Sequence, residues 1–180
     1  FRYPDLDDVE IPPVNDGPGM NLDDWNRTLD DKYGKTMYPG KATLRIGGDQ
    51  CFPFAAQAVM QARTYIKLRT YIFDNDDFAI RMADGLKQTS ERIEVKLMVD
   101  GLGTQMAQSA APGMMPQDYT PPIGITNYLR DDSNIEVRVL TNPWFTGDHS
   151  KTTIIDGEIA YVGGMNIGRE YRWEWHDLMM

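Results

Sequence analysis

The chain has 180 residues, and its 27 acidic and 18 basic side chains give a formal net charge of −9 with histidine taken as neutral. This is the length of one ordinary domain, and a hydrophobic content of 41% disfavours extended disorder, a collagen-like repeat or a coiled-coil rod. The acidic total disfavours a strongly basic nucleic-acid module, and one cysteine with two histidines excludes an internal disulfide and a Cys/His zinc site.

The first 40 residues differ in composition from the rest. They hold nine acidic and four basic side chains and five of the eleven prolines, which favours an extended arm rather than a domain of its own. Within this arm, Asn21 can cap a short helix that Gly34 can end. The apolar residues between them recur at helical spacing: Leu22, Trp25, Leu29 and Tyr33. We therefore predict an acidic, proline-rich arm over 1–40 and a folded domain over 41–180.

From residue 41 onward, hydrophobic periods of 2 and 3.6 alternate along the chain. We predict strands at 43–46, 66–73, 93–99, 135–140 and 149–155, and helices at 50–63 and 77–90. A strand, a helix and a second strand joined by short turns form a βαβ unit. The predicted fold class is therefore α/β, with a mixed, largely parallel sheet flanked by helices.

The segment 101–122 has no clear hydrophobic period, and we predict a long loop there. It follows a strand, where α/β proteins place ligand-binding loops, so it is either a lid over a substrate or a plain surface excursion. Glycines at 101 and 103 do not make a dinucleotide-binding loop, because Met106 stands where the third glycine belongs. Residues 74–77 begin like a calcium loop but lack its glycine and its final glutamate, and we predict no metal site.

One stretch near the end of the sequence carries candidate chemistry. His149 and Lys151 are two residues apart, so on a strand both side chains leave the same face of the sheet. An ammonium beside a neutral imidazole suits an anion, because the lysine supplies positive charge and the imidazole can act as a nucleophile or carry a proton. Such a pair alone is also typical of a solvated surface strand, so the residues that follow it decide its interpretation.

The residues after this pair extend the pattern. Asp156 and Gly157 predict a tight turn, followed by a returning strand. That strand leads to Gly163 and Gly164, whose backbone can approach a ligand and aim amide groups at phosphate oxygens. Asn166 adds a side-chain donor nearby. Together these residues predict a phosphate site that performs phosphoryl chemistry.

The stretch resembles the HKD signature of the phospholipase D superfamily at every defining position. It reads His149-x-Lys151-x4-Asp156-x6-Gly163-Gly164-x-Asn166. Four further segments are similar to the bacterial cardiolipin synthase branch: 71–76, 99–103, 154–157 and 166–171. Ser150 departs from that branch, which commonly has a basic residue there. The resemblance covers about 41–180 and is to the N-terminal half of a cardiolipin synthase-like protein.

This resemblance implies a two-step transfer that needs no metal and no cofactor. His149 would attack the phosphorus of a phosphodiester and form a phosphohistidine. Lys151 and Asn166 would bind the phosphate oxygens and stabilise developing charge. The backbone amides of Gly163 and Gly164 would add two more contacts. Water or another alcohol would then displace the enzyme, so hydrolysis and phosphatidyl transfer share one intermediate.

Two carboxylates complete the set of predicted catalytic residues. Asp156 belongs to the motif, although its turn position indicates that it chiefly fixes the hairpin. Asp177 resembles the family's carboxylate that orients the imidazole of the nucleophile; the alternative is a residue of a surface strand. His176 beside it is not a second catalytic histidine, because no lysine and aspartate follow it at the required spacing.

A complete site requires two such motifs, and this sequence contains one. The second comes either from a missing C-terminal half, which the apolar end at Met180 favours, or from an identical chain in a homodimer. We expect a phospholipid substrate at a peripheral membrane surface, in a bacterial protein that is membrane-associated or cytoplasmic. We expect no nucleic-acid substrate, because affinity for nucleic acid comes largely from basic residues. A homodimeric nuclease and a phosphate-binding module without turnover are the alternatives.

Overall fold

The computed structural model describes residues 17–34, 40–109, 115–141 and 147–180 of the chain. The chain divides into two units, Phe1–Lys41 and Ala42–Met180. Within the described residues, none of the helices has both the length and the apolar character that a membrane crossing demands.

The described part of the first unit contains helix α1 (Leu22–Tyr33). The Asn21 side chain accepts a hydrogen bond from the Asp24 amide at 3.2 Å and caps the start of the helix. Gly34 ends it in the left-handed conformation, with φ 62°. The predicted helix and both of its end residues are therefore confirmed.

A five-stranded sheet is the centre of the second unit. Its strands are β2 (Tyr65–Thr70), β3 (Glu94–Asp100), β4 (Glu136–Leu140), β5 (Thr152–Ile155) and β6 (Ile159–Val162), in the spatial order β4-β3-β2-β5-β6. The three strands β4, β3 and β2 are parallel, whereas β5 and β6 are antiparallel to their neighbours. A separate two-stranded sheet pairs β1 (Arg45–Ile46) with β7 (Leu178–Met179). The predicted α/β class with a mixed sheet is confirmed.

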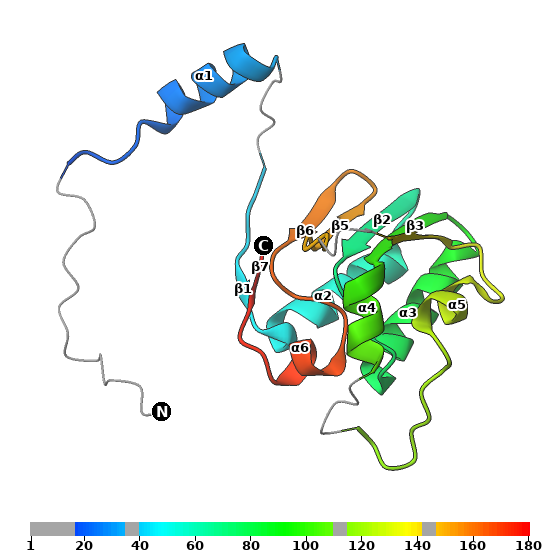
Figure 1. Ribbon diagram of the computed structural model, residues 1–180. Coiled ribbons are helices and arrows are strands. Elements are labelled where there is room, and N and C mark those ends of the chain that lie inside the picture. Colours follow the sequence, from blue (N-terminus) through cyan, green and yellow to red (C-terminus); the bar gives the residue numbers. More distant parts are fainter. Residues whose placement is uncertain (1–16, 35–39, 110–114, 142–146) are drawn as a thin grey trace, which may run out of the picture. The chain divides into compact units, whose positions relative to one another are not determined.

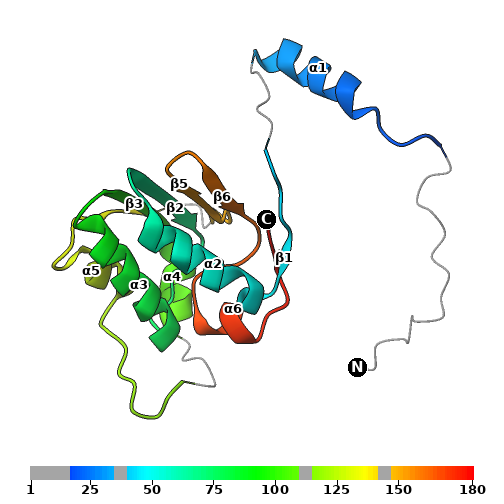
Figure 2. The same cartoon turned by 180° about the vertical axis from the view of Figure 1, so that it is seen from behind.

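Helices pack on one face of the five-stranded sheet (Figure 1; Figure 2). These helices are α2 (Gly48–Gln61), α3 (Asp77–Ser90) and α5 (Ile125–Arg130), and all three share one hydrophobic core with the strands. In β2, Ile66 and Leu68 are buried in that core, and the residues that directly follow each of them are exposed. The period-2 pattern of the sequence has this origin, because successive side chains of a strand point to opposite faces.

Part of the segment predicted to be a loop at 101–122 is a helix, α4 (Gly101–Gln108). The Asp100 carboxylate at the end of β3 accepts a hydrogen bond from the Gly103 amide at 2.8 Å and caps this helix. The predicted loop is therefore wrong over these residues, because two glycines in the first turn mask the helical pattern. Residues 110–114 lie outside the described part, and 115–124 contain neither helix nor strand.

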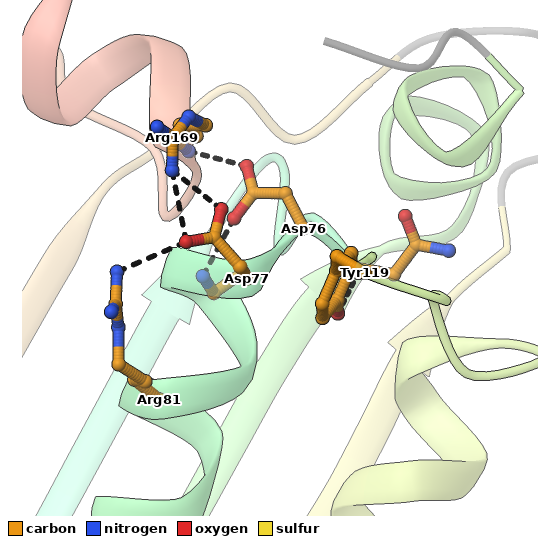
Figure 3. Close-up of polar contacts among 7 residues, drawn as sticks. Asp76, Asp77, Arg81, Tyr119 and Arg169 are labelled. Carbon is orange, nitrogen blue, oxygen red and sulfur yellow. Dashed lines mark hydrogen bonds and ion pairs between the residues drawn. The ribbon is translucent and has the colours of Figure 1, made fainter. Parts of the chain in front are cut away.

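The start of α3 is joined to the start of α6 (Arg169–Trp173) by two carboxylates (Figure 3). Asp76 is fully buried and accepts hydrogen bonds from the amides of Ala79, at 2.7 Å, and of Arg169. Asp77 forms an ion pair with the Arg169 guanidinium at 2.7 Å. Burial raises the pKa of Asp76, although the two amide hydrogen bonds oppose this shift. The 74–77 turn is thus a junction between two helices, and it fixes the segment that follows the hairpin.

Strands β5 and β6 form the predicted hairpin. Asp156 and Gly157 both adopt positive φ, 56° and 72°, as a two-residue turn of this kind requires. The strand before the turn is shorter than predicted, because β5 begins at Thr152 and not at residue 149. His149 and Lys151 therefore lie in the segment that leads into the strand, which corrects their predicted place on it.

Candidate active site

The segments that follow β2 and precede β5 meet at one edge of the sheet. The two strands are antiparallel, with Arg69 opposite Thr152, so the end of β2 lies beside the start of β5. Tyr71 follows β2, and Lys151 precedes β5. The parallel strands β2 and β3 also end at this edge, where α/β proteins commonly place their binding loops. The candidate active site lies here.

Lys151 is a buried lysine at this edge, with 4% of its surface exposed. Its Nζ donates a hydrogen bond to the backbone oxygen of His149 at 2.9 Å. Burial lowers the pKa of Lys151, and the carboxylates of Asp177 and Asp148 oppose that shift. An ammonium held in this way has lost much of its hydration, which strengthens its attraction for a phosphate oxygen.

Tyr71 brings the histidine and the lysine of the motif together. The ring centroids of Tyr71 and His149 lie 4.7 Å apart, with the planes inclined at 58°. The Nζ of Lys151 lies 5.2 Å from the centroid of the same Tyr71 ring. The predicted strand 66–73 includes Tyr71 and gives it no function. Because β2 ends at Thr70, the ring instead belongs to the turn at the site.

Asn166 is held against the end of β2 and is 4% exposed. Its Oδ1 accepts a hydrogen bond from the Ile72 amide at 3.0 Å and another from the Thr70 hydroxyl at 3.4 Å. Because Asn166 Oδ1 accepts hydrogen bonds from within the protein, the predicted contact of this side chain with phosphate would have to be made by Nδ2.

The glycine pair after the hairpin differs from its predicted role. The Gly163 amide donates to the Lys151 oxygen at 3.3 Å, and the Gly164 amide donates to the Leu178 oxygen at 3.0 Å. Both amides donate within the protein, so the predicted contact of these amides with phosphate is not prepared in this structure and stays a prediction. The lack of a Cβ at these two positions has a structural reason. A Cβ at Gly163 would overlap the Leu178 oxygen, and a Cβ at Gly164 would overlap the carboxylate of Asp177. The pair allows β7 and Asp177 to approach the motif.

Asp177 interacts electrostatically with Lys151, the lysine of the motif. Its charge raises the pKa of Lys151 against the effect of burial, and its Oδ1 accepts a hydrogen bond from the Leu178 amide at 2.7 Å. His149 is exposed, and within the described residues its imidazole forms no hydrogen bond. The predicted contact by which Asp177 orients His149 is therefore not formed in this structure, and it stays a prediction for the complete site.

Asp156 is separated from Lys151 by the length of β5. Its carboxylate accepts hydrogen bonds from three backbone amides, at 2.8, 2.9 and 3.1 Å: Thr64, Arg63 and Tyr65. These bonds hold the pKa of Asp156 well below its usual range. The carboxylate ties the hairpin turn to the segment before β2, as its turn position indicates. These contacts are those of a structural residue, and its inclusion among the catalytic residues stays a prediction.

A further carboxylate network anchors the segment before Lys151. The Asp148 amide donates to Asp100 Oδ2 at 2.9 Å, and the Asp148 carboxylate accepts from Arg69 Nε at 2.6 Å. Desolvation works to raise the pKa of Asp148, but hydrogen bonds from Arg69 and Ser150 outweigh it and lower the pKa. The sequence pattern gave no sign of this network, because its members lie on strands and loops far apart in the chain.

The arrangement places an accessible imidazole and a buried cation against one ring. No group of three or more His, Cys, Asp or Glu side chains could hold a metal ion among the residues that the structure describes. A displacement at phosphorus needs one group that attacks and another that protonates the leaving group. Among the described residues, one imidazole, that of His149, lies at this edge of the sheet.

Comparisons with known proteins identify the family. The family described as "Cardiolipin synthase, PLD-like domain" matches residues 56–176, and the chain belongs to this phospholipase D-like family. Cardiolipin synthase 1 from Bacillus anthracis is 28% identical over 152 residues, which are 78% of this chain and 27% of that protein. The cardiolipin synthase of Oceanobacillus iheyensis is 28% identical over 131 residues, 69% of this chain and 24% of that protein. The chain thus spans about a quarter of the length of these curated relatives.

Solved structures share the fold of the second unit. NucT from Helicobacter pylori superposes with a TM-score of 0.58 at 17% identity, over 77% of this chain and 82% of its own. Nuc from Salmonella typhimurium, a phospholipase D family member, gives 0.56 at 21% identity, over 76% of this chain and 80% of its own. At these identities the likeness shows the fold alone. It confirms the predicted phospholipase D-like α/β domain.

Proposed function

We propose that this chain provides one half of a phospholipase D-like active site, which hydrolyses phospholipid phosphodiesters or transfers their phosphatidyl group. The observation that carries the proposal is the corner at Tyr71, where an exposed His149 and a buried Lys151 contact one ring. Membership of the cardiolipin synthase family supports a phospholipid substrate, because the matched relatives are named for that synthesis.

The first step forms a phosphohistidine. A ring nitrogen of His149 bonds to phosphorus as the bond from phosphorus to the leaving alcohol oxygen breaks. A histidine from a second motif gives its proton to that oxygen. Lys151 Nζ and Asn166 Nδ2 bind the non-bridging oxygens and stabilise the negative charge that grows on them.

The second step releases the enzyme. Water or a second alcohol attacks the phosphohistidine, and the second histidine, now neutral, takes the proton of the attacking group. The bond between phosphorus and nitrogen breaks, which restores His149. Attack by water gives hydrolysis and attack by an alcohol gives phosphatidyl transfer, so both outcomes use the same residues.

A nuclease is the second candidate function. The fold likeness to Nuc and NucT favours it, because this chain covers about four fifths of each of those chains. The net charge of −9 disfavours it, since binding to nucleic acid relies on neutralisation of phosphates by Lys and Arg. Incubation with phosphatidylglycerol, phosphatidylcholine or single-stranded DNA separates the functions. Cardiolipin or phosphatidic acid supports the proposal, and cut DNA supports the nuclease. No product from any of them, with the chain alone or supplied with a second motif half, supports a binding module.

Replacement of His149 with Ala should abolish turnover and the covalent phosphoenzyme, because no other described side chain at this edge is a nucleophilic imidazole. His176→Ala is the matched control, since it removes the other histidine, which is exposed and outside the motif. We expect this control to keep its activity. Product formation and acid-quenched labelling by a radioactive phosphodiester measure both effects. Full activity of His149→Ala contradicts the assignment of the nucleophile.

Treatment with EDTA should leave the activity unchanged. In the proposed scheme the nucleophile is an imidazole and the charge on phosphate is met by side chains, so no step requires a divalent cation. The measurement compares initial rates before and after chelation. If EDTA abolishes the activity and added Mg²⁺ or Ca²⁺ restores it, the reaction requires a metal ion and the proposed scheme is wrong.

A further inference from the structure

The ring of Tyr71 is confined by the backbone of two glycines. A Cβ on Gly103 would lie 2.6 Å from the ring carbons Cε2 and Cζ, and a Cβ on Gly147 would lie 2.8 Å from Cε2. Such distances are far below van der Waals contact, so a larger residue at either position must displace the ring. Gly103 lies in α4, and Gly147 precedes the motif histidine. Two segments that are distant in sequence therefore leave a slot that the ring occupies.

The main chain on both sides of this ring is also fixed. The Thr104 hydroxyl donates a hydrogen bond to the backbone carbonyl oxygen of Tyr71 at 3.3 Å. The next residue, Ile72, donates its amide to Asn166 Oδ1 at 3.0 Å. One dipeptide therefore contacts all three side chains that the proposed reaction uses, because its ring meets the histidine and the lysine and its amide meets the asparagine.

The surroundings of the ring are not those of a core residue. Among the described residues, the two hydrophobic clusters of the domain do not include Tyr71. Its ring instead faces an imidazole, an ammonium and glycine backbone. A ring face attracts a cation that has lost its hydration, and a tilted ring pair restricts the rotation of an imidazole.

We propose that Tyr71 is a positioning residue, whose ring holds the imidazole of His149 and the ammonium of Lys151 so that both can meet one phosphate group. The proposal rests on the proposed function of the site, because it assigns Tyr71 a part in that chemistry. It adds a residue that lies outside the HKD signature, on a different strand end from the motif.

Variants of the full chain separate the ring from the hydroxyl. Tyr71→Phe keeps the ring face, whereas Tyr71→Leu removes it. Tyr65→Leu is the matched control, because the Tyr65 ring also has a lysine over it, Lys67 at 4.9 Å, but at the opposite end of β2. Circular dichroism of each variant shows whether it is folded.

The first readout is the titration of Lys151, followed by NMR of ¹³C-labelled lysine and assigned with Lys151→Gln. The groups that face this ammonium are the Tyr71 ring and the carboxylates of Asp148 and Asp177. Leucine keeps an apolar side chain against the ammonium but removes the attraction of the ring for the charged form, so Tyr71→Leu should lower the titration midpoint by about 0.5 to 1 pH unit. Tyr71→Phe and the control should stay near the wild type. An unchanged or raised midpoint in Tyr71→Leu overturns the proposal.

Gly147→Ala provides the answer if Tyr71→Leu does not fold. Its new methyl group displaces the ring while the tyrosine is kept, so the midpoint should move in the same direction as in Tyr71→Leu. An unmoved midpoint in a folded Gly147→Ala protein also overturns the proposal.

The second readout is turnover, which keeps the two proposals distinguishable. For an active protein we expect Tyr71→Leu to lower kcat about tenfold with KM nearly unchanged, and Tyr71→Phe to recover most of the rate. If neither the wild-type chain alone nor the chain supplied with a second motif half converts a phosphodiester, while the titration still moves as stated, the proposed function fails and the positioning by Tyr71 stands. If the wild type is active, and both the titration midpoint of Lys151 and kcat are unchanged in Tyr71→Leu, the proposed positioning role of Tyr71 is wrong and the proposed function stands.

Discussion

Residues that share one sequence signature serve two different purposes in this domain. His149 and Lys151 face a common ring at the edge of the sheet, and Asn166 is fixed beside them. Asp156 instead binds three backbone amides at the far end of β5. The spacing of a motif cannot separate these purposes, because a folded hairpin and a catalytic site both require a fixed register. The contacts of each residue in the structure distinguish the two purposes.

Asp156→Asn should lower the melting temperature by several degrees at pH 7. Asparagine tolerates the positive φ of this turn, so the change removes the charge and keeps the backbone conformation. The pKa of Asp156 lies below its usual range in the folded state, so its ionised form stabilises the fold above about pH 4, and this contribution declines as the pH falls further. Thermal unfolding followed by circular dichroism should show the difference shrink at pH 3.

The control for this prediction is Glu158→Gln in the same turn, where the side chain is exposed. It should unfold like the wild type at both pH values. A difference between wild type and Asp156→Asn that is equal at pH 7 and pH 3 contradicts the electrostatic explanation.

At the scale of elements, the sequence predicts those parts whose neighbours in space are also neighbours in sequence. The alternation around Ile66 and Leu68 gives β2, and the Asp156-Gly157 pair gives the hairpin. Helix α4 escapes prediction, because it is held by a cap from Asp100 and masked by glycines. The site is likewise predicted only where it follows the motif. The ring of Tyr71 comes from another strand, so local spacing carries no sign of its contact with the motif.

Gly163→Ala should destabilise the domain by about 1–3 kcal/mol. Its Cβ would overlap the backbone oxygen of Leu178, and backbone cannot move aside as a flexible side chain can, so the junction between β6 and β7 must open. Gly85→Ala is the matched control. It lies within α3, and the nearest atom to its Cβ would be Met60 Sδ at 4.0 Å, so the change should stabilise by about 0.5–1 kcal/mol through helix propensity. Urea unfolding of both variants measures the two signs. A stable Gly163→Ala protein would show that β7 does not need this close approach.

At the scale of the whole molecule, the proposed reaction requires a second histidine at the site. The described part of the chain brings one motif imidazole to the site, whereas the proposed reaction needs an attacking histidine and a proton-donating one. In the proposed reaction, the second histidine would come from a further half of the polypeptide or from a second copy of this chain. The match covers about a quarter of the cardiolipin synthase from Bacillus anthracis and about four fifths of Nuc and NucT, so the comparisons are compatible with both sources.

Any turnover by this 180-residue chain should therefore depend on pairs of copies. In an equal mixture of wild type and His149→Ala at fixed total concentration, after exchange of subunits, only about a quarter of the pairs contain two intact histidines, so about a quarter of the wild-type rate should remain. Copies that act independently would retain about half. Mixing with His176→Ala should retain the full rate, which controls for dilution and for damage to the fold. A remaining rate of one half would show that each chain acts alone, and the requirement for a second motif would then be wrong.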